Sequence, residues 1–390
     1  MRVLVLGAGL QGKAVIHDLE QSSLVSEIIV ADMDTRGIAE FGLKLDLRKI
    51  SLVTADAADP NDLQRVIRDA DARVVICMLP PSFGSAVARA ALDNGVPFVS
   101  SSYTGSIIEL DEEARRQGVT ILPEMGMDPG IDLLLAQIAL AELDEVHGLY
   151  SYGAGLPEPS CADNPIRYKI TWTFDGVLKA YKRPARLLNE GKTLDIPGDE
   201  IFRQENIHLV DIPGLGTLEA YPNGDSIHYI DTFKLDKHIQ NMGRFALRYS
   251  GHCQFWQTLA DLGFLDDDPM SFNGANVSPH QFLVQHLTPR LQFGQGERDV
   301  VVVRIRAWGL KDRKPTEVTV QLTDYRDLPT GLFAMNRTVG YTTSIAAQLI
   351  LAGDIVKAGV LSPVGDVPVA RVVNELKARG MIVESSLEQL

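Results

Sequence analysis

A glycine-rich turn near the amino terminus constrains the fold more than any other feature of the chain. Gly7, Gly9 and Gly12 form the pattern Gly-x-Gly-x-x-Gly, directly after the apolar run Val3–Leu6 and directly before a helical pattern. In that context the first glycine permits a tight turn, the second lets backbone approach a pyrophosphate, and the third lets the helix pack closely on the strand. The pattern also occurs in purely structural turns, but its position between a strand and a helix favours a dinucleotide-binding βαβ unit.

Short β-branched runs alternate with helical patterns through the first third of the chain, as is typical of a parallel sheet with crossover helices. We expect helices to begin near Gly12, Thr35, Pro60, Ser82 and Ile107, one of them capped by Asp59. The sequence predicts an α/β fold whose first domain, residues 1–126, is a Rossmann doubly wound parallel sheet. The expected strands are Val3–Leu6, Glu27–Ala31, Ser51–Thr54, Arg73–Met78, Pro97–Ser101 and Thr120–Pro123.

The sequence pattern changes after Asp128-Pro129. An apolar helical run, Ile131–Leu143, is followed there by longer expected strands and hairpin turns. This pattern predicts a second α/β domain, residues 127–333, with a mostly antiparallel mixed sheet. A helical period over Ala334–Ala352 then predicts a C-terminal helical return, residues 334–390, that packs on the Rossmann domain. The strands expected in the second domain are Glu145–Tyr152, Thr217–Tyr221, Ser226–Phe233, Phe245–Tyr249, Asp299–Trp308 and Glu317–Tyr325.

Length, charge and cysteine content exclude several classes of protein. The 390 residues exceed the roughly 250–300 at which one core stops growing, so two domains are expected. A formal net charge of −14 repels phosphate backbones, so nucleic acid is not an expected partner. Cys77, Cys161 and Cys253 have no metal-ligand spacing, which favours reduced thiols, a cytoplasmic location and no metal site. We find neither a signal peptide nor an uncharged apolar run long enough for a membrane helix.

Asp32 governs the expected choice of cofactor. It lies twenty positions after Gly12, at the end of the second expected strand, where a carboxylate accepts hydrogen bonds from the adenosine ribose and repels a 2′-phosphate. NAD is therefore expected, with NADP as the less favoured cofactor, although Arg36 follows closely and is either a phosphate ligand or a solvated helix-start residue. The residues expected to bind the cofactor are Gly7, Gly9, Leu10, Gln11, Gly12, Asp32, Met78, Leu79, Pro80 and Ser101.

The segment Gly126-Met127-Asp128-Pro129-Gly130-Ile131-Asp132 resembles one found in the saccharopine dehydrogenase family, in particular its glutamate-forming saccharopine reductases. Essentially the whole chain takes part in the likeness. The resemblance implies a Rossmann domain, a substrate-binding and dimerisation domain and a C-terminal return, assembled as a homodimer. It also implies a small amino-acid substrate and hydride transfer between the nicotinamide and the carbon of a secondary amine or imine, in lysine metabolism. Further similar segments lie at 155–157, 163–165, 174–178, 218–223, 247–251, 337–340 and 359–363.

Two sites depart from the reductase pattern and leave the substrate open. Gly224 stands where the reductases have an arginine expected to grip a substrate carboxylate, and Gly153 stands where they have a cysteine. The lysine 6-dehydrogenases, which release ammonia from the ε-carbon of lysine, are similar in the segment 248–252 and in the acid after the second strand. The segment Asp163-Asn164-Pro165 favours the saccharopine side. A nucleotide-binding sensor without catalysis is the third alternative.

Several polar side chains are candidates for the substrate side, each with a structural alternative. Tyr103 and Asp128 are the catalytic candidates: Tyr103 either assists proton transfer or packs under the nicotinamide, and Asp128 either caps a helix or holds a substrate ammonium. Arg244 and Arg248 are candidates to clamp a carboxylate, which a guanidinium binds through two hydrogen bonds, or are surface residues of a strand. The other substrate-binding candidates are Asp132, Gly155, Lys169 and His252, of which Asp132 also fits a helix-dipole role and His252 a structural one.

Overall fold

The computed structural model describes residues 1–41, 45–235 and 238–390, which divide into two compact units. The first unit contains residues 1–134 and 335–381, and the second contains residues 135–334 and 382–390. The expected boundary at residue 126 differs from this division, because the chain leaves the first unit inside helix α6 (Ile131–Leu140).

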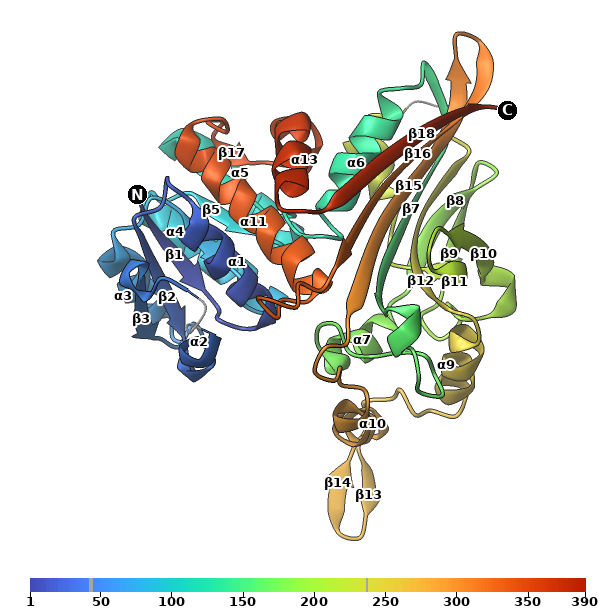
Figure 1. The fold of residues 1–390 in the computed structure, drawn as a ribbon, viewed down its shortest axis with the longest axis horizontal. Helices are drawn as coiled ribbons and strands as arrows, with labels where there is room; N and C mark the ends of the chain where they lie inside the picture. Colours follow the sequence, from blue (N-terminus) through green and yellow to red (C-terminus); the bar gives the residue numbers. More distant parts are fainter. Residues whose placement is uncertain (42–44, 236–237) are drawn as a thin grey trace. The chain divides into compact units, whose positions relative to one another are not determined.

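The first unit is built on a parallel sheet with the strand order β17-β6-β5-β4-β1-β2-β3, and each of the neighbouring pairs is parallel (Figure 1). All six strands expected from the first third of the sequence are present, and the short β17 extends the sheet beyond β6. This is the doubly wound α/β class that the sequence predicts. The strands are β1 (Arg2–Leu6), β2 (Glu27–Asp32), β3 (Ile50–Thr54), β4 (Val75–Cys77), β5 (Phe98–Ser100), β6 (Thr120–Leu122) and β17 (Gly359–Val360).

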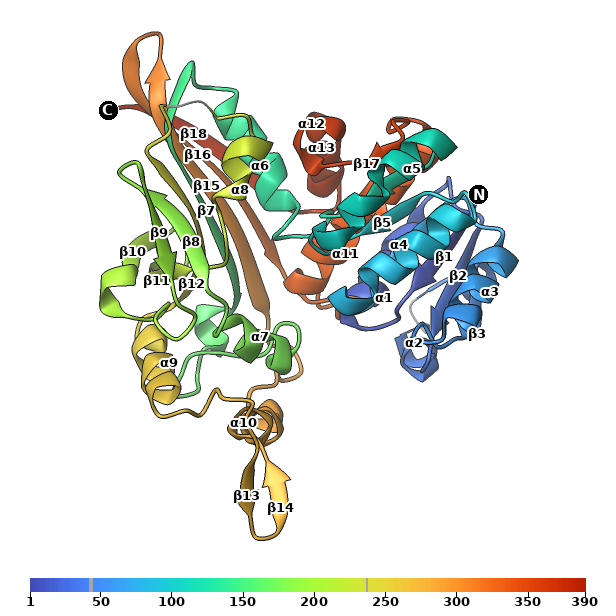
Figure 2. The same ribbon diagram turned by 180° about the vertical axis from the view of Figure 1, so that it is seen from behind.

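Helices cover both faces of this sheet. One face carries α3, α4 and α5, and the other carries α1 and α11 (Figures 1 and 2). Asp59 caps α3 as expected, since its side chain accepts the Asn61 N–H at 2.9 Å. Gly340 of α11 lies so close to α1 that a Cβ there would be 2.7 Å from the Cβ of Ala14. The helices are α1 (Leu10–Gln21), α2 (Arg36–Phe41), α3 (Pro60–Ala70), α4 (Gly84–Asp93), α5 (Asp111–Gln117), α11 (Ala334–Ala352), α12 (Pro363–Asp366) and α13 (Val369–Ala378).

The second unit is built on a mixed sheet with the strand order β10-β11-β12-β7-β15-β16-β18, and β8 and β9 join it beside β12. Only β7 and β12 pair in parallel among the described strands of this sheet, so the expected mostly antiparallel pairing is confirmed. The strands are β7 (Glu145–Pro157), β8 (Ala185–Asn189), β9 (Lys192–Ile196), β10 (His208–Ile212), β11 (Gly216–Pro222), β12 (Asn241–Tyr249), β15 (Asp299–Lys311), β16 (Lys314–Tyr325) and β18 (Ile382–Gln389).

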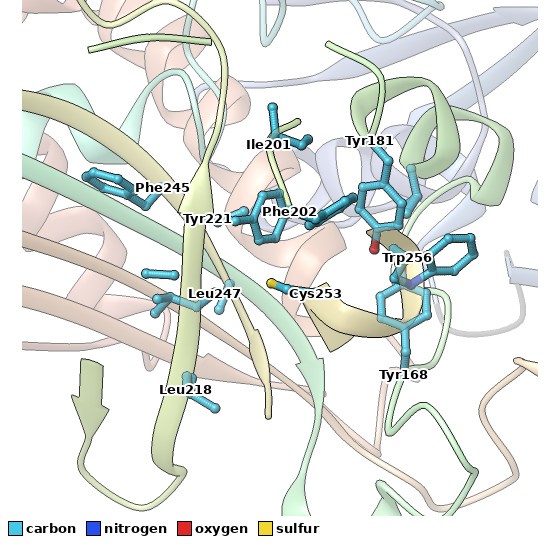
Figure 3. Packing of buried hydrophobic residues seen from close by; sticks show 14 of the residues in the cluster. Tyr168, Tyr181, Ile201, Phe202, Leu218, Tyr221, Phe245, Leu247, Cys253 and Trp256 are labelled. Atoms are coloured by element: carbon cyan, nitrogen blue, oxygen red, sulfur yellow. The ribbon is translucent and has the colours of Figure 1, made fainter. Parts of the chain in front are cut away.

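Shorter helices and one hairpin complete the second unit. In chain order α7 (Phe174–Ala180) lies between β7 and β8, whereas α9 (His252–Asp261) and α10 (Pro279–Leu287) lie between β12 and β15. The hairpin of β13 (Met270–Phe272) and β14 (Ala275–Val277) projects beyond α10 (Figures 1 and 2). The core of this unit combines aliphatic and aromatic side chains, and Figure 3 shows Tyr168, Tyr181 and Trp256 grouped together in it. No helix in the described ranges combines the length and apolar character needed to cross a membrane.

Two segments adopt structures other than those expected. The expected strand Ser226–Phe233 is wrong, because helix α8 (His228–Thr232) forms there; Asp225 accepts the Ile227 N–H at 2.9 Å and starts a helical turn that local backbone hydrogen bonds continue. The helical return expected over 334–390 ends before β18, which pairs with β16 in the second unit. Most side chains of β18 are exposed at the edge of the sheet, so the alternation that marks a half-buried strand is missing from its sequence.

Candidate functional site

The glycine turn between β1 and α1 has the geometry that a dinucleotide requires. Gly7 has φ +100°, and a Cβ there would lie 2.8 Å from the carbonyl carbon of Met78, so this backbone needs glycine. A Cβ on Gly12 would collide with the carbonyl oxygen of Gly7, which lets α1 begin directly against β1. By contrast, a Cβ on Gly9 would meet no atom within 4 Å among the described residues. The second glycine therefore faces open space, as an approaching pyrophosphate requires.

The first turn of α1 has the features that favour an anion. Its N-cap, Gly9, makes no side-chain capping bond, and the first turn carries no acidic residue. Uncapped N–H groups at a helix start attract phosphate through their hydrogen bonds and the helix dipole. Leu10 and Gln11, the expected cofactor contacts, lie in this turn.

Asp32 lies at the end of β2, and its carboxylate is engaged by the chain itself. Oδ2 accepts the Ala8 N–H at 2.6 Å, and Oδ1 accepts the Asp34 N–H at 2.9 Å. Asp32 thus ties the glycine turn to the loop after β2. Two cations stand near this loop: Arg36 donates two hydrogen bonds to Asp34, and the Lys13 Nζ lies 3.4 Å from where a Cβ on Gly37 would be.

The other candidates of the first unit follow neighbouring strands at the carboxyl edge of the sheet. Met78, Leu79 and Pro80 follow β4, and the backbone of Met78 and Leu79 lies against Gly7. Ser101 and Tyr103 follow β5, where Tyr103 is 39% exposed. Because the carboxyl ends of parallel strands share one edge, the fold brings these residues to the edge that also carries the glycine turn.

A compact loop that carries Asp128 follows β6, and Asp132 lies in the first turn of α6 directly after it. The N–H of Gly126 donates to the carbonyl of Pro129, and Gly130 adopts φ +142° while its N–H donates to Asp132 Oδ1 at 2.7 Å. Asp132 is 2% exposed; burial, assisted by the charge of Glu124, raises its pKa to about 7 against the lowering effect of backbone hydrogen bonds. This carboxyl is therefore able to change protonation state near neutral pH.

Glu124 is a residue of this region to which the sequence assigned no role. It has φ +63°, an uncommon backbone conformation for a non-glycine residue, and it is largely buried. Its side chain accepts hydrogen bonds from both the N–H and the hydroxyl of Thr104. A glutamate in the left-handed region has no signature in a single sequence, and Glu124 lies just before the segment 126–132 that resembles the family.

In the second unit, Arg248 is a buried cation on β12. It is 9% exposed, its Nη1 donates to the Leu247 carbonyl, and no carboxylate pairs with it among the described residues. Its cross-strand neighbour Glu219 instead accepts the N–H groups of Gly251 and Cys253 at the start of α9. The guanidinium carbon lies 5.5 Å from the ring centre of Tyr168 and 5.9 Å from that of Tyr221.

Arg244 and Gly155 lie on neighbouring strands of the same sheet. Arg244 is buried on β12, where Nη1 lies 3.2 Å from the Tyr229 hydroxyl and its guanidinium stacks over that ring at 4.8 Å. Gly155 lies in β7, opposite Val301 of β15. Arg244 and Arg248 are both buried, so neither is the surface residue of a strand that was the alternative to a carboxylate clamp.

Lys169 and His252 have protein partners that account for their burial. The Lys169 ammonium bonds Glu297 at 2.6 Å and Asp163 at 3.0 Å; burial opposes its charge, but these carboxylates leave its pKa raised. The His252 ring bonds the Tyr181 hydroxyl at 2.8 Å, and burial together with the charge of Arg248 lowers the pKa of His252 well below its usual value. Lys169 therefore stays charged and His252 neutral, which suits structural roles better than proton transfer at neutral pH.

Comparison with known protein families shows which family the chain belongs to. Residues 126–381 match the family model described as "Saccharopine dehydrogenase C-terminal domain", and residues 3–122 match the one described as "Saccharopine dehydrogenase NADP binding domain". The chain belongs to the saccharopine dehydrogenase family. The resemblance inferred from the sequence is thereby confirmed.

Individual relatives cover nearly all of the chain. The alpha-aminoadipic semialdehyde synthase of Bos taurus is 27% identical over 98% of this chain and 47% of its own length, so the chain spans about half of that relative. The saccharopine dehydrogenase [NADP(+), L-glutamate-forming] of Saccharomyces cerevisiae is 28% identical over 96% of each chain. The solved apo structure of the L-Glu-forming enzyme from that yeast matches with a TM-score of 0.86 and 25% identity over 99% of each chain.

The expected preference for NAD over NADP is wrong. Residues 3–122 match a family model for NADP binding, and the yeast relative that spans the chain carries NADP(+) in its name. The expectation treated Asp32 as a carboxylate reserved for the ribose, whereas both of its oxygens accept backbone N–H groups of the chain. It also left Arg36 as either a phosphate ligand or a solvated residue and did not consider Lys13, although both residues place positive charge beside the same loop.

Proposed function

We propose that the chain is an NADP-dependent oxidoreductase that acts on the secondary amine of saccharopine and forms L-glutamate and α-aminoadipate semialdehyde. Membership of the saccharopine dehydrogenase family over nearly the whole chain carries this proposal. The open face at Gly9 and the uncapped start of α1 support it, because they are what a bound dinucleotide needs. In the reaction a substrate carbon loses a hydride and the amine loses a proton, and water splits the resulting imine.

The bound dinucleotide would accept the hydride, so the chain's own residues bind, orient and exclude water. The turn of Gly7, Gly9 and Gly12 would hold the pyrophosphate, while Lys13 and Arg36 would face the 2′-phosphate. Tyr103 and Asp128, at the carboxyl edge of the same sheet, are the proposed groups for proton transfer and for the substrate ammonium.

Arg248 is the proposed ligand of a substrate carboxylate. A buried guanidinium without a carboxylate partner among the described residues is costly unless an anion binds it. Arg248→Met should raise the KM for saccharopine by about 10-fold to 100-fold, the loss of one or two charge-assisted hydrogen bonds, while the fold stays intact. Lys179→Met, which removes an exposed cation of α7 paired with Asp175, is the matched control and should leave KM unchanged.

The decisive experiment measures reduced-cofactor formation by the purified protein with saccharopine or L-lysine, each in the presence of NADP and of NAD. Turnover of saccharopine with a higher kcat/KM for NADP supports the proposal. Turnover of lysine alone would assign the chain to the lysine 6-dehydrogenase type, which the missing arginine at Gly224 keeps as a specific alternative. Cofactor binding without turnover of either amine would contradict both enzyme proposals and favour a sensor.

We also propose a homodimer and a cytoplasmic location. The dimer rests on the family resemblance, and the location rests on the three free cysteines, which suit a reducing compartment. Light scattering of the purified protein tests the dimer, and a monomer over the working concentration range would contradict it. Fractionation of source cells tests the compartment.

A further inference from the structure

The segment that follows β5 is held in place by the residues that follow β6, within the first unit. The N–H of Met125 donates to the Ser100 carbonyl at 2.9 Å, and the N–H of Glu124 donates to the Ser102 carbonyl at 2.9 Å. The Glu124 side chain then accepts the N–H of Thr104 at 3.0 Å and its hydroxyl at 2.9 Å. Three alternate residues of one segment are thus bound by two consecutive residues of the other.

The residues between these anchor points are Ser101 and Tyr103. Ser101 lies against the loop after β6, since a Cβ on Gly126 would be 3.0 Å from the Ser101 Cβ. Tyr103 keeps an exposed ring on a segment whose backbone is bound on both sides of it. The bonds that fix Ser102 and Thr104 therefore restrict where the Tyr103 side chain can lie.

The contact between Glu124 and Thr104 is present although the backbone conformation of Glu124 is energetically unfavourable. A glutamate at φ +63° is held there by its surroundings, and such conformations gather at functional sites. A glycine would adopt the same backbone without strain but would lack the carboxylate that binds Thr104. The chain therefore has a glutamate at a position whose backbone conformation favours glycine.

We propose that Glu124 is a positioning residue, which clamps Thr104 and Ser102 so that Ser101 and Tyr103 are presented to the reacting end of the site. This inference rests on the proposed function for the identity of the reaction. Asp132 is a second buried carboxyl close enough to Glu124 for the charge of Glu124 to affect it.

The test uses Glu124→Gly, which removes the carboxylate but suits the backbone, and Thr104→Val, which removes only the hydroxyl donor. Both should lower kcat with saccharopine by about 10-fold to 100-fold, the usual cost of a displaced reacting group, with NADPH affinity unchanged. Thr104→Ser restores the hydroxyl and should restore kcat. Because the two residues act through one contact, the double variant should lose little more than either single variant.

Asp59→Asn is the matched control, because Asp59 also bonds a backbone N–H in the first unit but lies at the start of α3. A kcat loss in the control equal to that of the clamp variants, or an unchanged kcat in both clamp variants, would overturn the proposal. Failure of Thr104→Ser to recover activity would do the same.

Hydrogen exchange separates failure of this inference from failure of the proposed function. Amides of residues 100–106 should exchange faster in Glu124→Gly than in the unaltered chain, whatever the substrate. An unaltered chain that does not oxidise saccharopine would contradict the proposed function, whereas unchanged exchange in the variant would contradict the clamp itself.

Discussion

At the scale of single residues, the glycine turn shows how one missing Cβ serves either folding or binding. A Cβ on Gly12 would collide with the Gly7 carbonyl, whereas a Cβ on Gly9 would meet no described atom within 4 Å. We therefore expect Gly12→Ala to lower the free energy of unfolding by about 1–3 kcal/mol through overpacking. Gly9→Ala should leave stability nearly unchanged but weaken NADPH binding by about 10-fold or more, because its methyl group occupies the approach of the pyrophosphate.

Urea unfolding and fluorescence titration with NADPH measure these two effects separately. The control is Ala86→Gly at an exposed position of α4, which measures how much an ordinary exchange of alanine and glycine in a helix changes the free energy of unfolding. Gly95→Ala cannot serve, because Gly95 has a positive φ that alanine disfavours. Equal loss of affinity in both glycine variants, without any difference in stability, would contradict the division of roles.

Asp132 should make the free energy of unfolding fall as the pH rises. Burial raises its pKa in the folded chain to about 7, above the value of about 3.9 expected when unfolded. From about pH 4 to pH 7 the unfolded chain releases this proton while the folded chain retains it, so the contribution of Asp132 to the free energy of unfolding falls as pH rises. Asp132→Asn keeps an acceptor for the Gly130 N–H and should be more stable than the unaltered chain at pH 8, by at most about 4 kcal/mol, and equal to it at pH 4.

Urea denaturation of both chains at several pH values between 4 and 8 checks this expectation. The difference between the two curves isolates Asp132, because every other titrating group is common to both chains. A difference that stays constant across the range would show that folding does not raise the pKa of Asp132, contrary to this expectation.

At the scale of elements, a buried ion pair joins the end of α13 to α1 within the first unit. Arg379 Nε lies 2.5 Å from Asp18 Oδ1, and Ser344 of α11 donates to the other oxygen at 2.6 Å. Arg379→Met should cost about 3–5 kcal/mol of unfolding free energy, because it leaves the Asp18 carboxylate buried without its cation. Replacing both partners with apolar residues, Asp18→Leu with Arg379→Met, should recover much of that loss.

Thermal and urea unfolding measure the effect, and the same helix offers a control. Arg371 of α13 forms an exposed pair with Glu375 at 3.7 Å, and Arg371→Met should change stability by less than about 0.5 kcal/mol. Similar losses at Arg371 and Arg379 would show that burial does not strengthen the Asp18 pair.

Regular elements were predictable where burial imposes a pattern, and were missed where it does not. The runs that became β1, β2 and β4 are apolar because both faces of a parallel sheet are covered. The hairpin of β8 and β9 was missed although Glu190 and Gly191 form its turn with φ +49° and +75°, because much of β9 is exposed. In the site, the glycine turn was predictable from its spacing, whereas the role of Glu124 depends on a backbone angle and a contact with Thr104 that spacing cannot reveal.

At the scale of the whole molecule, the division into units follows contacts between distant segments rather than sequence order. The apolar runs predicted two domains and a late helix α11 that belongs with the Rossmann sheet, and α11 does lie in the first unit from residue 335. The final segment was harder to predict, because β18 makes backbone bonds at a sheet edge and most of its side chains are exposed. A strand that is held mainly by backbone hydrogen bonds leaves no alternation of apolar and polar side chains, so β18 cannot be recognised from the sequence.

Removal of residues 382–390 tests this division, because β18 is the part of the C-terminal segment that belongs to the second unit. Its ladder with β16 runs from Thr316 to Thr323, and its loss should destabilise the second unit by about 1–4 kcal/mol, the net worth of several backbone hydrogen bonds after the entropy of ordering is subtracted. Hydrogen exchange should accelerate in β16, while NADPH affinity, set by the first unit, changes by less than about 2-fold. Removal of Leu390 alone is the control, since that residue contributes one bond to Pro315. Loss of NADPH binding in the shorter chain would show that β18 stabilises the first unit as well, contrary to the division proposed here.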